Sequence, residues 1–507
     1  MTSLDSFLQR KVTVRRSVIL ILISLLSTPG VWPQQPVNKP QLASEVRAEF
    51  LHAWNGYKKY AWGHDDLKPL SKTYHDWYAE PLLMTPVDAL DTMILMGLKD
   101  EANRTREYIV KNLSFDKNID VQNFEITIRL LGGFLSSYQL TGDKRLLDLA
   151  EDLGNHLLPV FESPTGLPYR YLNLKTGKVR GNVTNPAEAG TLLIEFGTLS
   201  KLTHRPIFFD KAKRALVEIY KRRSPIGLVG TWINVETGAW TDTDSHISGA
   251  IDSYYEYLLK CAILFDDQDC RRMWTESIAA INRYLADEIT RESPSLRGSP
   301  PQRELWYGHA DMNTGKRTAT TYGALDAFFP AMLALSGDID RAQRLQKSSF
   351  NMWEVHGIEP EEINYTTMEV TSPGYPLRPE IIESIYYLYH YASAKSTRSF
   401  RRGTRPSRAA QVPPLNESRK KLDADHYLQM GAMMFRDFVK YCRTDEGYAA
   451  LKSVVTKEKS DSMQSFLFAE TFKYFYLLFA SPSTLDFDKV IFNTEAHPIR
   501  RNFRPGK

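Results

Sequence analysis

Cysteine is scarce in this chain. Three cysteines among 507 residues cannot build a disulfide-dense scaffold. Cys261 and Cys270 are close enough in sequence for one local disulfide, which would leave Cys442 unpaired, and three buried free thiols are an equally good interpretation. No CxxC pair or Cys/His motif predicts a structural zinc site. The cysteines therefore give no reason to expect a small fold stabilised by several disulfides or by zinc.

Excess charge of one sign and long apolar runs are also scarce. The net charge is only +4, so the composition does not indicate nucleic acid as a partner, and no obligate protein partner is evident. Beyond the N-terminus, charged residues interrupt every apolar run, which excludes further membrane-spanning segments. With 42% hydrophobic and 12% aromatic residues, the chain can still bury a large core.

The N-terminal segment has the three parts of an export signal. A basic stretch that ends at Arg16 precedes the apolar residues 17–26, and small or turn-forming residues follow at 27–30. The apolar part is about half as long as a bilayer requires. We predict that residues 1–33 form a cleaved signal peptide or an uncleaved signal anchor. The protein would then be secreted, periplasmic or in the ER or Golgi lumen.

Apolar residues recur at three- and four-residue spacing through most of the chain, which predicts about fourteen helices. The expected helices cover residues 42–60, 88–96, 100–113, 124–140, 144–158, 187–202, 208–222, 248–265, 271–287, 322–335, 339–356, 379–393, 424–442 and 463–479. Short turns join them, and strand-like pieces such as 227–238 and 485–494 are brief. This order of elements fits a toroid of helix pairs better than a bundle.

The helical pattern predicts a single domain over residues 40–500 with one insertion. Residues 395–421 are basic, rich in Ser, Arg and Pro, and without apolar periodicity. We interpret them as a basic surface insertion, and a docking patch for a polyanion is the alternative.

Five segments place a carboxylate inside an otherwise apolar or aromatic run. They read NFEITIRLLGG (123–133), GAIDSYYEYLLK (249–260), YPLRPEIIESIYYLY (375–389), FLFAETFKYFYLLF (466–479) and VIFNTEAHP (490–498). A buried ionised carboxylate costs on the order of several kcal/mol unless it is paired, hydrogen-bonded or bound to a metal. Segments so far apart in sequence suggest one acidic pocket, so a catalytic or cation-binding site is the first hypothesis.

Together with YAWGHDDLKP (60–69), PVDALDT (86–92) and AEAGTLLIEFGTLS (187–200), these segments resemble glycoside hydrolase family 47, the class I α-1,2-mannosidases. FNTEAHP and LRPExxES are the most specific parts of the resemblance. The resemblance implies an all-α fold, an (α/α)7 barrel with a short C-terminal β-hairpin that enters the barrel.

The resemblance implies three catalytic carboxylates. Glu125 in FEITIR matches the general acid, and Asp252 matches a second carboxylate that is the acid or relays its proton through water. Glu380 in LRPEIIES matches the base that activates water. Without the resemblance, Glu125 would be interpreted as half of a structural ion pair, Asp252 as a helix N-cap and Glu380 as part of a plain first helical turn.

Further matches imply the rest of the site. Substrate-binding positions correspond to Arg129, Arg378, Glu383, Phe466, Glu470, Glu495 and Glu188, and Glu195 falls in the same segment as Glu188. Thr494 matches a residue that binds Ca²⁺ through its carbonyl and hydroxyl oxygens. Calcium prefers such oxygen ligands, but no EF-hand motif in this chain would have predicted it.

The implied activity is an inverting, calcium-dependent exo-α-1,2-mannosidase that trims terminal mannose from high-mannose N-glycans or related mannosides. Ala250, Ala324 and Ala327 replace an Arg, a His and a Cys of the processing mannosidases, as in the ER degradation-enhancing mannosidase-like branch. YAWGHDDLKP resembles the processing enzymes instead. The alternative is a weakly catalytic glycan-binding protein of the ER-degradation type. An unrelated α/α-toroid enzyme such as a polysaccharide lyase would not explain FNTEAHP.

Overall fold

The computed structural model describes residues 37–291, 302–393 and 423–502, which belong to one compact unit, Val37–Lys507. The predicted leader (1–33) and basic insertion (395–421) lie outside these ranges. In the described part, every helix is too short or too polar to cross a membrane.

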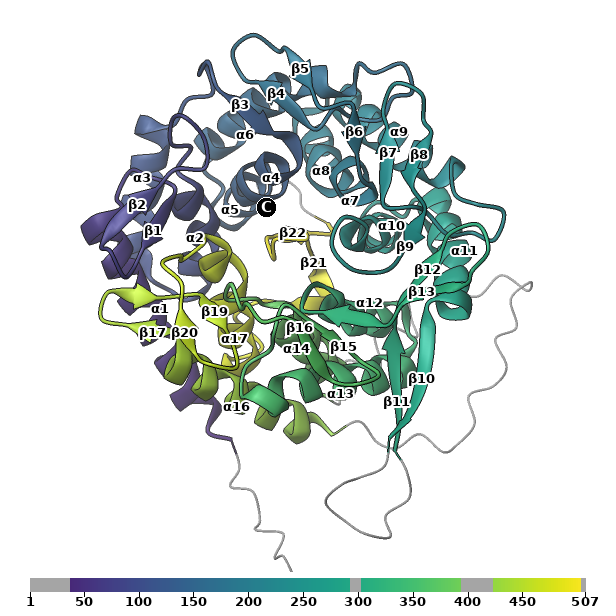
Figure 1. Cartoon of the computed structure of the whole chain (residues 1–507). Helices are drawn as coiled ribbons and strands as arrows, with labels where there is room; N and C mark the ends of the chain where they lie inside the picture. Colours follow the sequence, from purple (N-terminus) through teal and green to yellow (C-terminus); the bar gives the residue numbers. More distant parts are fainter. Residues whose placement is uncertain (1–36, 292–301, 394–422, 503–507) are drawn as a thin grey trace, which may run out of the picture. The chain divides into compact units, whose positions relative to one another are not determined.

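Within this unit, helices of the described ranges pack as seven pairs in a closed ring (Figure 1). The pairs are α2 (Met84–Leu95) with α3 (Lys99–Asn112), α5 (Gly132–Thr141) with α6 (Lys144–Leu157), α8 (Leu193–Thr203) with α9 (Pro206–Lys221), α10 (Asp252–Leu264) with α11 (Gln268–Tyr284), α12 (Phe329–Ser336) with α13 (Ile339–His356), α14 (Glu380–Ala392) with α16 (Ala424–Cys442), and α17 (Phe472–Phe479) with α1 (Lys39–Tyr60). The last pair closes the ring, because it joins the first helix to the last. The prediction of an (α/α)7 barrel is confirmed.

The inner and outer helices differ in composition for a physical reason. Inner helices such as α12 (FPAMLALS) are buried on nearly every side, since they face both the ring centre and their outer partners. Outer helices such as α6 and α9 bury one stripe and expose the rest to solvent. Two short helices, α4 (Asn123–Ile126) and α7 (Pro186–Gly190), extend the inner layer.

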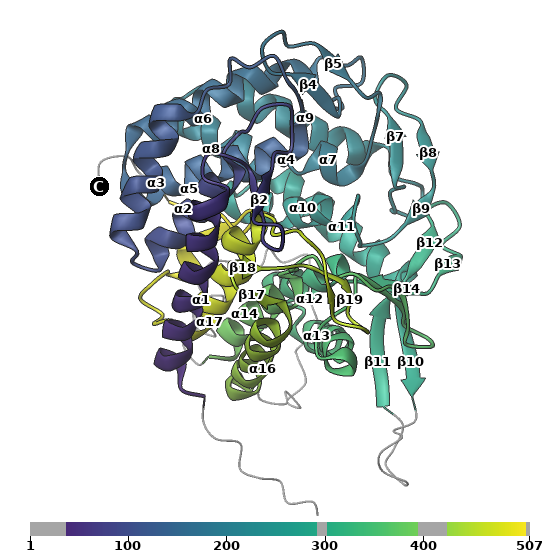
Figure 2. The same ribbon diagram turned by 60° about the vertical axis from the view of Figure 1, so that its left-hand side comes forward.

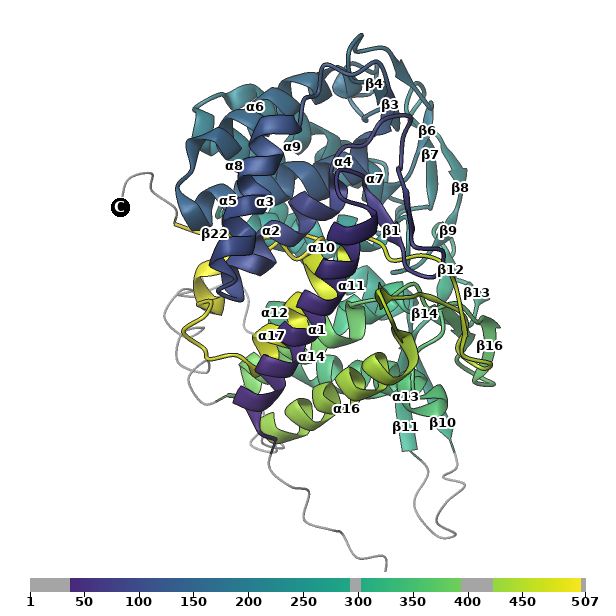
Figure 3. The ribbon, with the colours of Figure 1, turned by 90° about the vertical axis from the view of Figure 1, so that its left-hand side faces the viewer.

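Short strands in the connections form nine small antiparallel sheets within the described residues. Most of these strands lie along one rim of the ring (Figures 2 and 3). They are β1 (Asp66–Lys68), β2 (Thr73–His75), β3 (Asp120–Gln122), β4 (Tyr171–Asn173), β5 (Val179–Arg180), β6 (Val183–Thr184), β7 (Trp232–Asn234), β8 (Trp240–Asp242), β9 (Asp244–Ser245), β10 (Ala286–Arg291), β11 (Gln302–Tyr307), β12 (His309–Asp311), β13 (Arg317–Ala319), β14 (Thr321–Gly323), β15 (Glu362–Asn364), β16 (Glu369–Ser372), β17 (Arg443–Thr444), β18 (Gly447–Tyr448), β19 (Leu451–Ser453), β20 (Glu458–Lys459), β21 (Val490–Phe492) and β22 (Pro498–Arg500).

Five of the turns between these strands share one backbone form. They span residues 173–177, 234–238, 311–315, 364–368 and 453–457. In each turn the first side chain accepts a hydrogen bond from a backbone N–H two or three residues later. The fifth residue has a positive φ, which glycine adopts freely in three turns and which Met368 (φ 64) and Lys457 (φ 62) adopt at a steric cost.

Several helix predictions differ from the structure. The predicted helix 187–202 is interrupted at residues 191–192, between α7 and α8, and the predicted helix 248–265 begins too early, because α10 starts at Asp252. The predicted helices 124–140 and 463–479 each contain a π-helical turn, Thr127–Leu131 and Leu467–Thr471. The predicted helix 322–335 begins too early, because β14 occupies its first residues and α12 starts at Phe329. Apolar spacing cannot reveal a π-helical turn, since one extra residue in the turn leaves the local composition unchanged.

The hairpin of β21 and β22 lies at the centre of the ring, as predicted (Figure 1). Gly132 at the start of α5 permits its close approach. A Cβ atom at this position would lie 2.5 Å from Asn493 Nδ2, so any larger residue would push the hairpin away.

Cys261 and Cys270 form a disulfide, and Cys442 is a buried free thiol. Of the two interpretations of the cysteines, the local bridge is therefore correct. It joins inner helix α10 to its outer partner α11 across a sequence separation of 9 residues.

Removal of this bridge should destabilise the ring without changing its architecture. Closing so short a loop restricts the unfolded chain, so the Cys261→Ala/Cys270→Ala variant should lose about 2–3 kcal/mol of unfolding free energy. A reductant should lower the melting temperature of the wild type and of Cys442→Ala, which keeps the bridge. It should leave the double variant unchanged in calorimetry. Equal sensitivity of all three proteins to the reductant would contradict a stabilising bridge.

Candidate active site

A cavity of about 410 Å³ lies between the inner helices and the turn of the C-terminal hairpin. Its volume falls within the range of small-molecule sites. The structure brings all eleven residues of the predicted site to its wall, from six separate segments. These residues are Glu125, Arg129, Glu188, Asp252, Arg378, Glu380, Glu383, Phe466, Glu470, Thr494 and Glu495.

Arg129 links three carboxylates at one side of the cavity. It lies in the π-helical turn Thr127–Leu131, and its Nε donates to Glu125 Oε2 at 2.9 Å. Its Nη1 contacts Glu495 and lies 3.6 Å from Asp88 Oδ2. One buried guanidinium therefore serves acids from three distant segments, which is more than the simple i, i+4 ion pair that the sequence suggests.

Glu380 is the first residue of α14 and lies beside Arg378. Glu361 holds Arg378 by a bidentate ion pair of 2.8 and 2.9 Å, and Arg378 Nη1 lies 3.9 Å from Glu380 Oε1. Burial raises the pKa of Glu380 to about 7; Arg378 acts against the rise, and the charges of Glu361 and Asp252 add to it. Among the described residues no group hydrogen-bonds Glu380 Oε2, so this oxygen is available to a water or a ligand.

Asp252 begins α10 at the end of a tight turn. The Ser248 carbonyl accepts hydrogen bonds from the N–H groups of Ile251 and Asp252 at 3.1 and 3.0 Å. Ile251, not Asp252, occupies the N-cap position, so the capping interpretation of Asp252 is wrong. Burial raises the pKa of Asp252 to about 7, against the hydrogen bonds from Ser253. A carboxyl group with this pKa can donate a proton near neutral pH.

Glu383 and Glu470 are buried next to these two acids. Burial raises the pKa of Glu383 to about 8, although the charge of Lys260 acts against it. Burial, and then the charges of Glu380 and Glu383, hold the pKa of Glu470 well above its usual range. The carboxyl groups of the cavity therefore cannot all be ionised near neutral pH unless another positive charge is present.

Asn493 holds the turn that carries Thr494. Its Oδ1 accepts from the backbone N–H groups of Glu495 and His497 at 3.0 and 2.8 Å, and its Nδ2 donates to Glu195 Oε1 at 2.8 Å. Glu195, which the sequence connects with the cavity, is not one of the lining residues. It supports the Thr494 turn from the side away from the cavity, through its hydrogen bond with Asn493.

A fully buried ion-pair network lies beneath this turn. Asp91 contacts Lys473 Nζ at 2.8 Å and His497 Nδ1 at 2.7 Å, and His497 Nε2 lies 3.3 Å from Asp88. Although burial acts to raise it, Lys473 and His497 lower the pKa of Asp91 to about 2. This network anchors the hairpin to α2 and α17, and so fixes the position of Thr494 relative to these helices.

The composition of the cavity wall fits a hard cation. Thr494 offers carbonyl and hydroxyl oxygens, and calcium takes about six to eight oxygen ligands with nearby carboxylates to balance its charge. A buried oxygen of Glu380, in this wall, lacks a hydrogen-bond partner among the described residues. The wall has eight carboxylates (Glu125, Glu188, Asp252, Glu256, Glu380, Glu383, Glu470, Glu495) and three guanidinium groups (Arg129, Arg170, Arg378).

Sequence reasoning missed eight polar or aromatic residues of the wall: Gln122, Phe124, Arg170, Asn185, Trp232, Ser253, Glu256 and Phe328. Arg170 Nε lies 2.6 Å from Glu188 Oε2, and its guanidinium lies 5.3 Å from the centre of the Trp232 ring. Glu256 follows Asp252 by one helical turn, so helical spacing could have identified it. Arg170 and Trp232 come from connections between helices, where no periodicity marks them.

Comparisons with known proteins identify the family of this chain. The profile of glycosyl hydrolase family 47 matches residues 49–401 and 422–501. The chain is 35% identical over 493 residues to alpha-mannosidase I MNS5 of Arabidopsis thaliana, covering 92% of this chain and 78% of that protein. It is 34% identical over 491 residues to ER degradation-enhancing alpha-mannosidase-like protein 2 of Mus musculus, covering 90% and 76%.

A solved structure, the alpha-1,2-mannosidase from Trichoderma reesei, superposes with a TM-score of 0.77 at 27% identity, over 91% of this chain and 99% of that one. The family profile covers most of the chain, and both relatives share more than 30% identity along nearly its whole length. This protein is therefore a member of glycosyl hydrolase family 47.

Proposed function

We propose that this protein is an inverting, calcium-dependent exo-α-1,2-mannosidase that removes terminal mannose from high-mannose N-glycans or related mannosides. One observation carries the proposal: Asp252 and Glu380, two carboxyls with pKa values of about 7, line one cavity with Thr494 and six further carboxylates. The similarity to an alpha-1,2-mannosidase of known structure supports the linkage.

Asp252 is the proposed direct proton donor to the glycosidic oxygen. Its buried position lets it keep a proton near neutral pH, and proton donation lets the bond between the anomeric carbon and this oxygen break. Glu125 is already in an ion pair with Arg129, an arrangement that suits a carboxylate better than a proton donor. We therefore give Glu125 a positioning role toward the leaving group and its waters.

Glu380 is the proposed base. As a carboxylate it accepts a proton from the water that attacks the anomeric carbon, while the glycosidic oxygen leaves on the opposite face with the proton of the acid. Arg378 Nη1, 3.9 Å away, favours the ionised form that this role requires. Attack opposite the leaving group converts an α-linkage into β-mannose.

Phe466 and its neighbours are the proposed sugar-binding surface. The guanidinium groups of Arg129 and Arg378 each lie 5.8 Å from the centre of the Phe466 ring. An aromatic face accepts the C–H face of a sugar, and the surrounding guanidinium groups and carboxylates can bond its hydroxyls. Glu188, Glu383, Glu470 and Glu495 are the proposed hydroxyl acceptors.

Thr494 is the proposed calcium ligand at the base of the cavity. A bound calcium ion would balance the charge of the carboxylates and offer open coordination positions to sugar hydroxyls. The buried carboxylates with raised pKa values, Glu383 and Glu470, are the groups whose ionisation it would favour.

A weakly catalytic glycan-binding protein of the ER-degradation type is the second candidate. It is supported by the 34% identity to ER degradation-enhancing alpha-mannosidase-like protein 2. The presence of both Asp252 and Glu380 in the cavity supports catalysis instead. In either case we propose export through the secretory route, on the composition of residues 1–33 and the ER name of this relative.

Glu380→Gln should abolish mannose release and leave ligand binding measurable. The amide keeps the shape of the side chain but cannot accept a proton from water, so turnover should fall at least about 1,000-fold. Rates on a high-mannose glycan and binding of a mannose-based inhibitor would be measured together. Glu354→Gln, on the exposed face of α13, is the matched control and should keep wild-type rates. A Glu380→Gln rate within tenfold of wild type would show that Glu380 is not the base.

The first product should be β-mannose. Water that attacks opposite the leaving group inverts the anomeric carbon, and acid and base about 6.5–9.5 Å apart leave room for this water. Proton NMR of the early reaction resolves the two anomers before they interconvert. If α-mannose appears first, the enzyme retains configuration and the role of Glu380 must be revised.

Calcium should stabilise the fold most at high pH. Glu380 and Glu383 have pKa values raised from 4.5 to about 7 and about 8. Between pH 4.5 and pH 8, these two groups therefore bind more protons in the folded state than in the unfolded state. The unfolding free energy of the metal-free protein should therefore fall as pH rises through this window. Calcium at a hundredfold excess over Kd should restore about 2.7 kcal/mol at pH 8, and much less at pH 5, where the carboxyls are protonated.

Calorimetry of metal-stripped protein from pH 5 to pH 8, with and without CaCl₂, measures this difference. Magnesium should substitute poorly, because it prefers a smaller octahedral shell and keeps its waters. Thr494→Val, which removes only the hydroxyl ligand, should weaken the calcium effect. Identical melting temperatures with and without calcium at pH 8, with no residual metal by elemental analysis, would refute the calcium site.

A further inference from the structure

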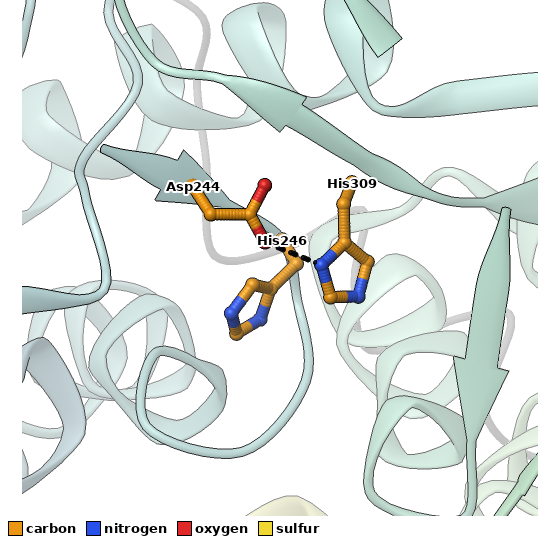
Figure 4. Close-up of side chains that lie close together, drawn as sticks. All are labelled: Asp244, His246 and His309. Atoms are coloured by element: carbon orange, nitrogen blue, oxygen red, sulfur yellow. Dashed lines mark hydrogen bonds and ion pairs between the residues drawn. The ribbon is translucent and has the colours of Figure 1, made fainter. Parts of the chain in front are cut away.

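Two histidines and an aspartate meet outside the cavity, where β9 pairs with β12 (Figure 4). Ser245 lies opposite Ala310 in this pairing, so the next position sets His246 beside His309. The two imidazole rings are 4.4 Å apart between centroids, and His309 Nδ1 lies 2.6 Å from Asp244 Oδ2.

We propose that Asp244, His246 and His309 bind a divalent transition-metal ion of the zinc class. One ligand atom of each residue lies within 4.8 Å of the other two. Zinc bonds to imidazole nitrogen and carboxylate oxygen measure about 2.0–2.2 Å, so tetrahedral ligands stand somewhat more than 3 Å apart. To reach this spacing, the Asp244–His309 contact would have to open and the His246 side chain would have to move closer to both. Three protein ligands leave a fourth position for water.

The ligand types separate this cluster from the proposed calcium site. Imidazole nitrogens suit zinc, cobalt, nickel and copper, whereas calcium selects oxygen ligands. None of the three residues lines the cavity. The inference therefore stands independently of the proposed mannosidase activity.

A threonine hydroxyl contacts each proposed ligand. The contacts are Thr318 Oγ1 to Asp244 Oδ1 at 2.6 Å, Thr231 Oγ1 to His246 Nε2 at 3.2 Å, and Thr321 Oγ1 to His309 Nε2 at 3.3 Å. Outer hydrogen bonds of this kind orient metal ligands and set which ring nitrogen is free of a proton. The cluster thus has both the proposed ligands and threonine hydroxyl groups that orient them.

The ring nitrogens of the two histidines already have polar partners. Ser248 N–H donates to His246 Nδ1 at 3.2 Å, so an ion that binds this nitrogen must displace the Ser248 contact. An ion that takes the place of the proton between His309 Nδ1 and Asp244 releases it to solvent when the imidazole is doubly protonated, and moves it to Nε2 when the imidazole is neutral.

An ion at this site would brace the segment that leads to Asp252. His246 is two residues before Ser248, whose carbonyl forms the turn at the start of α10. The side chains of His309 and Asp244 are 18% and 32% exposed, so solvent and ions can reach the cluster. The bound ion would add to the short strand pairing and the Asp244–His309 contact that join β9 and β12 now.

The test is zinc binding by the full chain. Metal-stripped protein is equilibrated with CaCl₂, titrated with ZnCl₂ by calorimetry in two buffers of different ionisation enthalpy, and desalted for elemental analysis. We expect one retained zinc per chain, with release of up to one proton. Cobalt(II) in place of zinc should give visible d–d absorption bands from a site with nitrogen and oxygen ligands.

Asp244→Asn and His309→Gln should each weaken zinc binding at least 100-fold and remove the cobalt bands, and Thr318→Val should weaken it about 10–100-fold. His426→Asn, an exposed histidine on α16, is the matched control and should bind as the wild type does. His246 is buried, so the variant His246→Asn can fail to fold. In that case Asp244→Asn is the deciding variant, because the Asp244 side chain is 32% exposed. Failure of the wild type to retain zinc, or undiminished binding by both Asp244→Asn and His309→Gln, overturns the proposal.

Discussion

The inner face of this ring depends on one electrostatic constraint, the compensation of carboxylates buried among apolar helices. Asp91 satisfies it fully: Lys473 and His497 contact it at 2.8 and 2.7 Å, and all three side chains are inaccessible to solvent. A buried charge without such partners is strongly destabilising. Because Asp91 belongs to α2, Lys473 to α17 and His497 to the C-terminal hairpin, this ion-pair network also joins the two ends of the ring to its centre.

The same constraint produces the chemistry of the cavity. Asp91 has two cationic partners and a pKa of about 2. Glu380 has only Arg378, which Glu361 already holds, and its pKa is about 7. A carboxyl group with enough buried cationic partners therefore stays ionised, whereas one with too few can take up and release a proton near neutral pH. A proton donor, a proton acceptor and a cation site all require that imbalance, so the cavity trades some stability for reactivity.

Sequence periodicity predicted most of the helices, because each inner or outer helix repeats its apolar spacing over several turns. It could not reveal the π-helical turns that carry Arg129 and Glu470, nor the start of α12, where a strand and a 3₁₀ turn replace the expected helix. The resemblance of five acidic segments to a known family predicted the residues of the cavity wall, but Arg170 and Trp232 in the strand connections gave no such signal.

By itself the sequence determined which segments are helical, which helices are apolar enough to be inner ones, and which acids would have to share a pocket. Those properties depend on neighbours along the chain. The tertiary structure decided the pKa of each acid, the supporting role of Glu195, the disulfide between Cys261 and Cys270, and the meeting of His246 with His309. These properties depend on distance and burial between groups that can be far apart in sequence, and only the folded chain sets them.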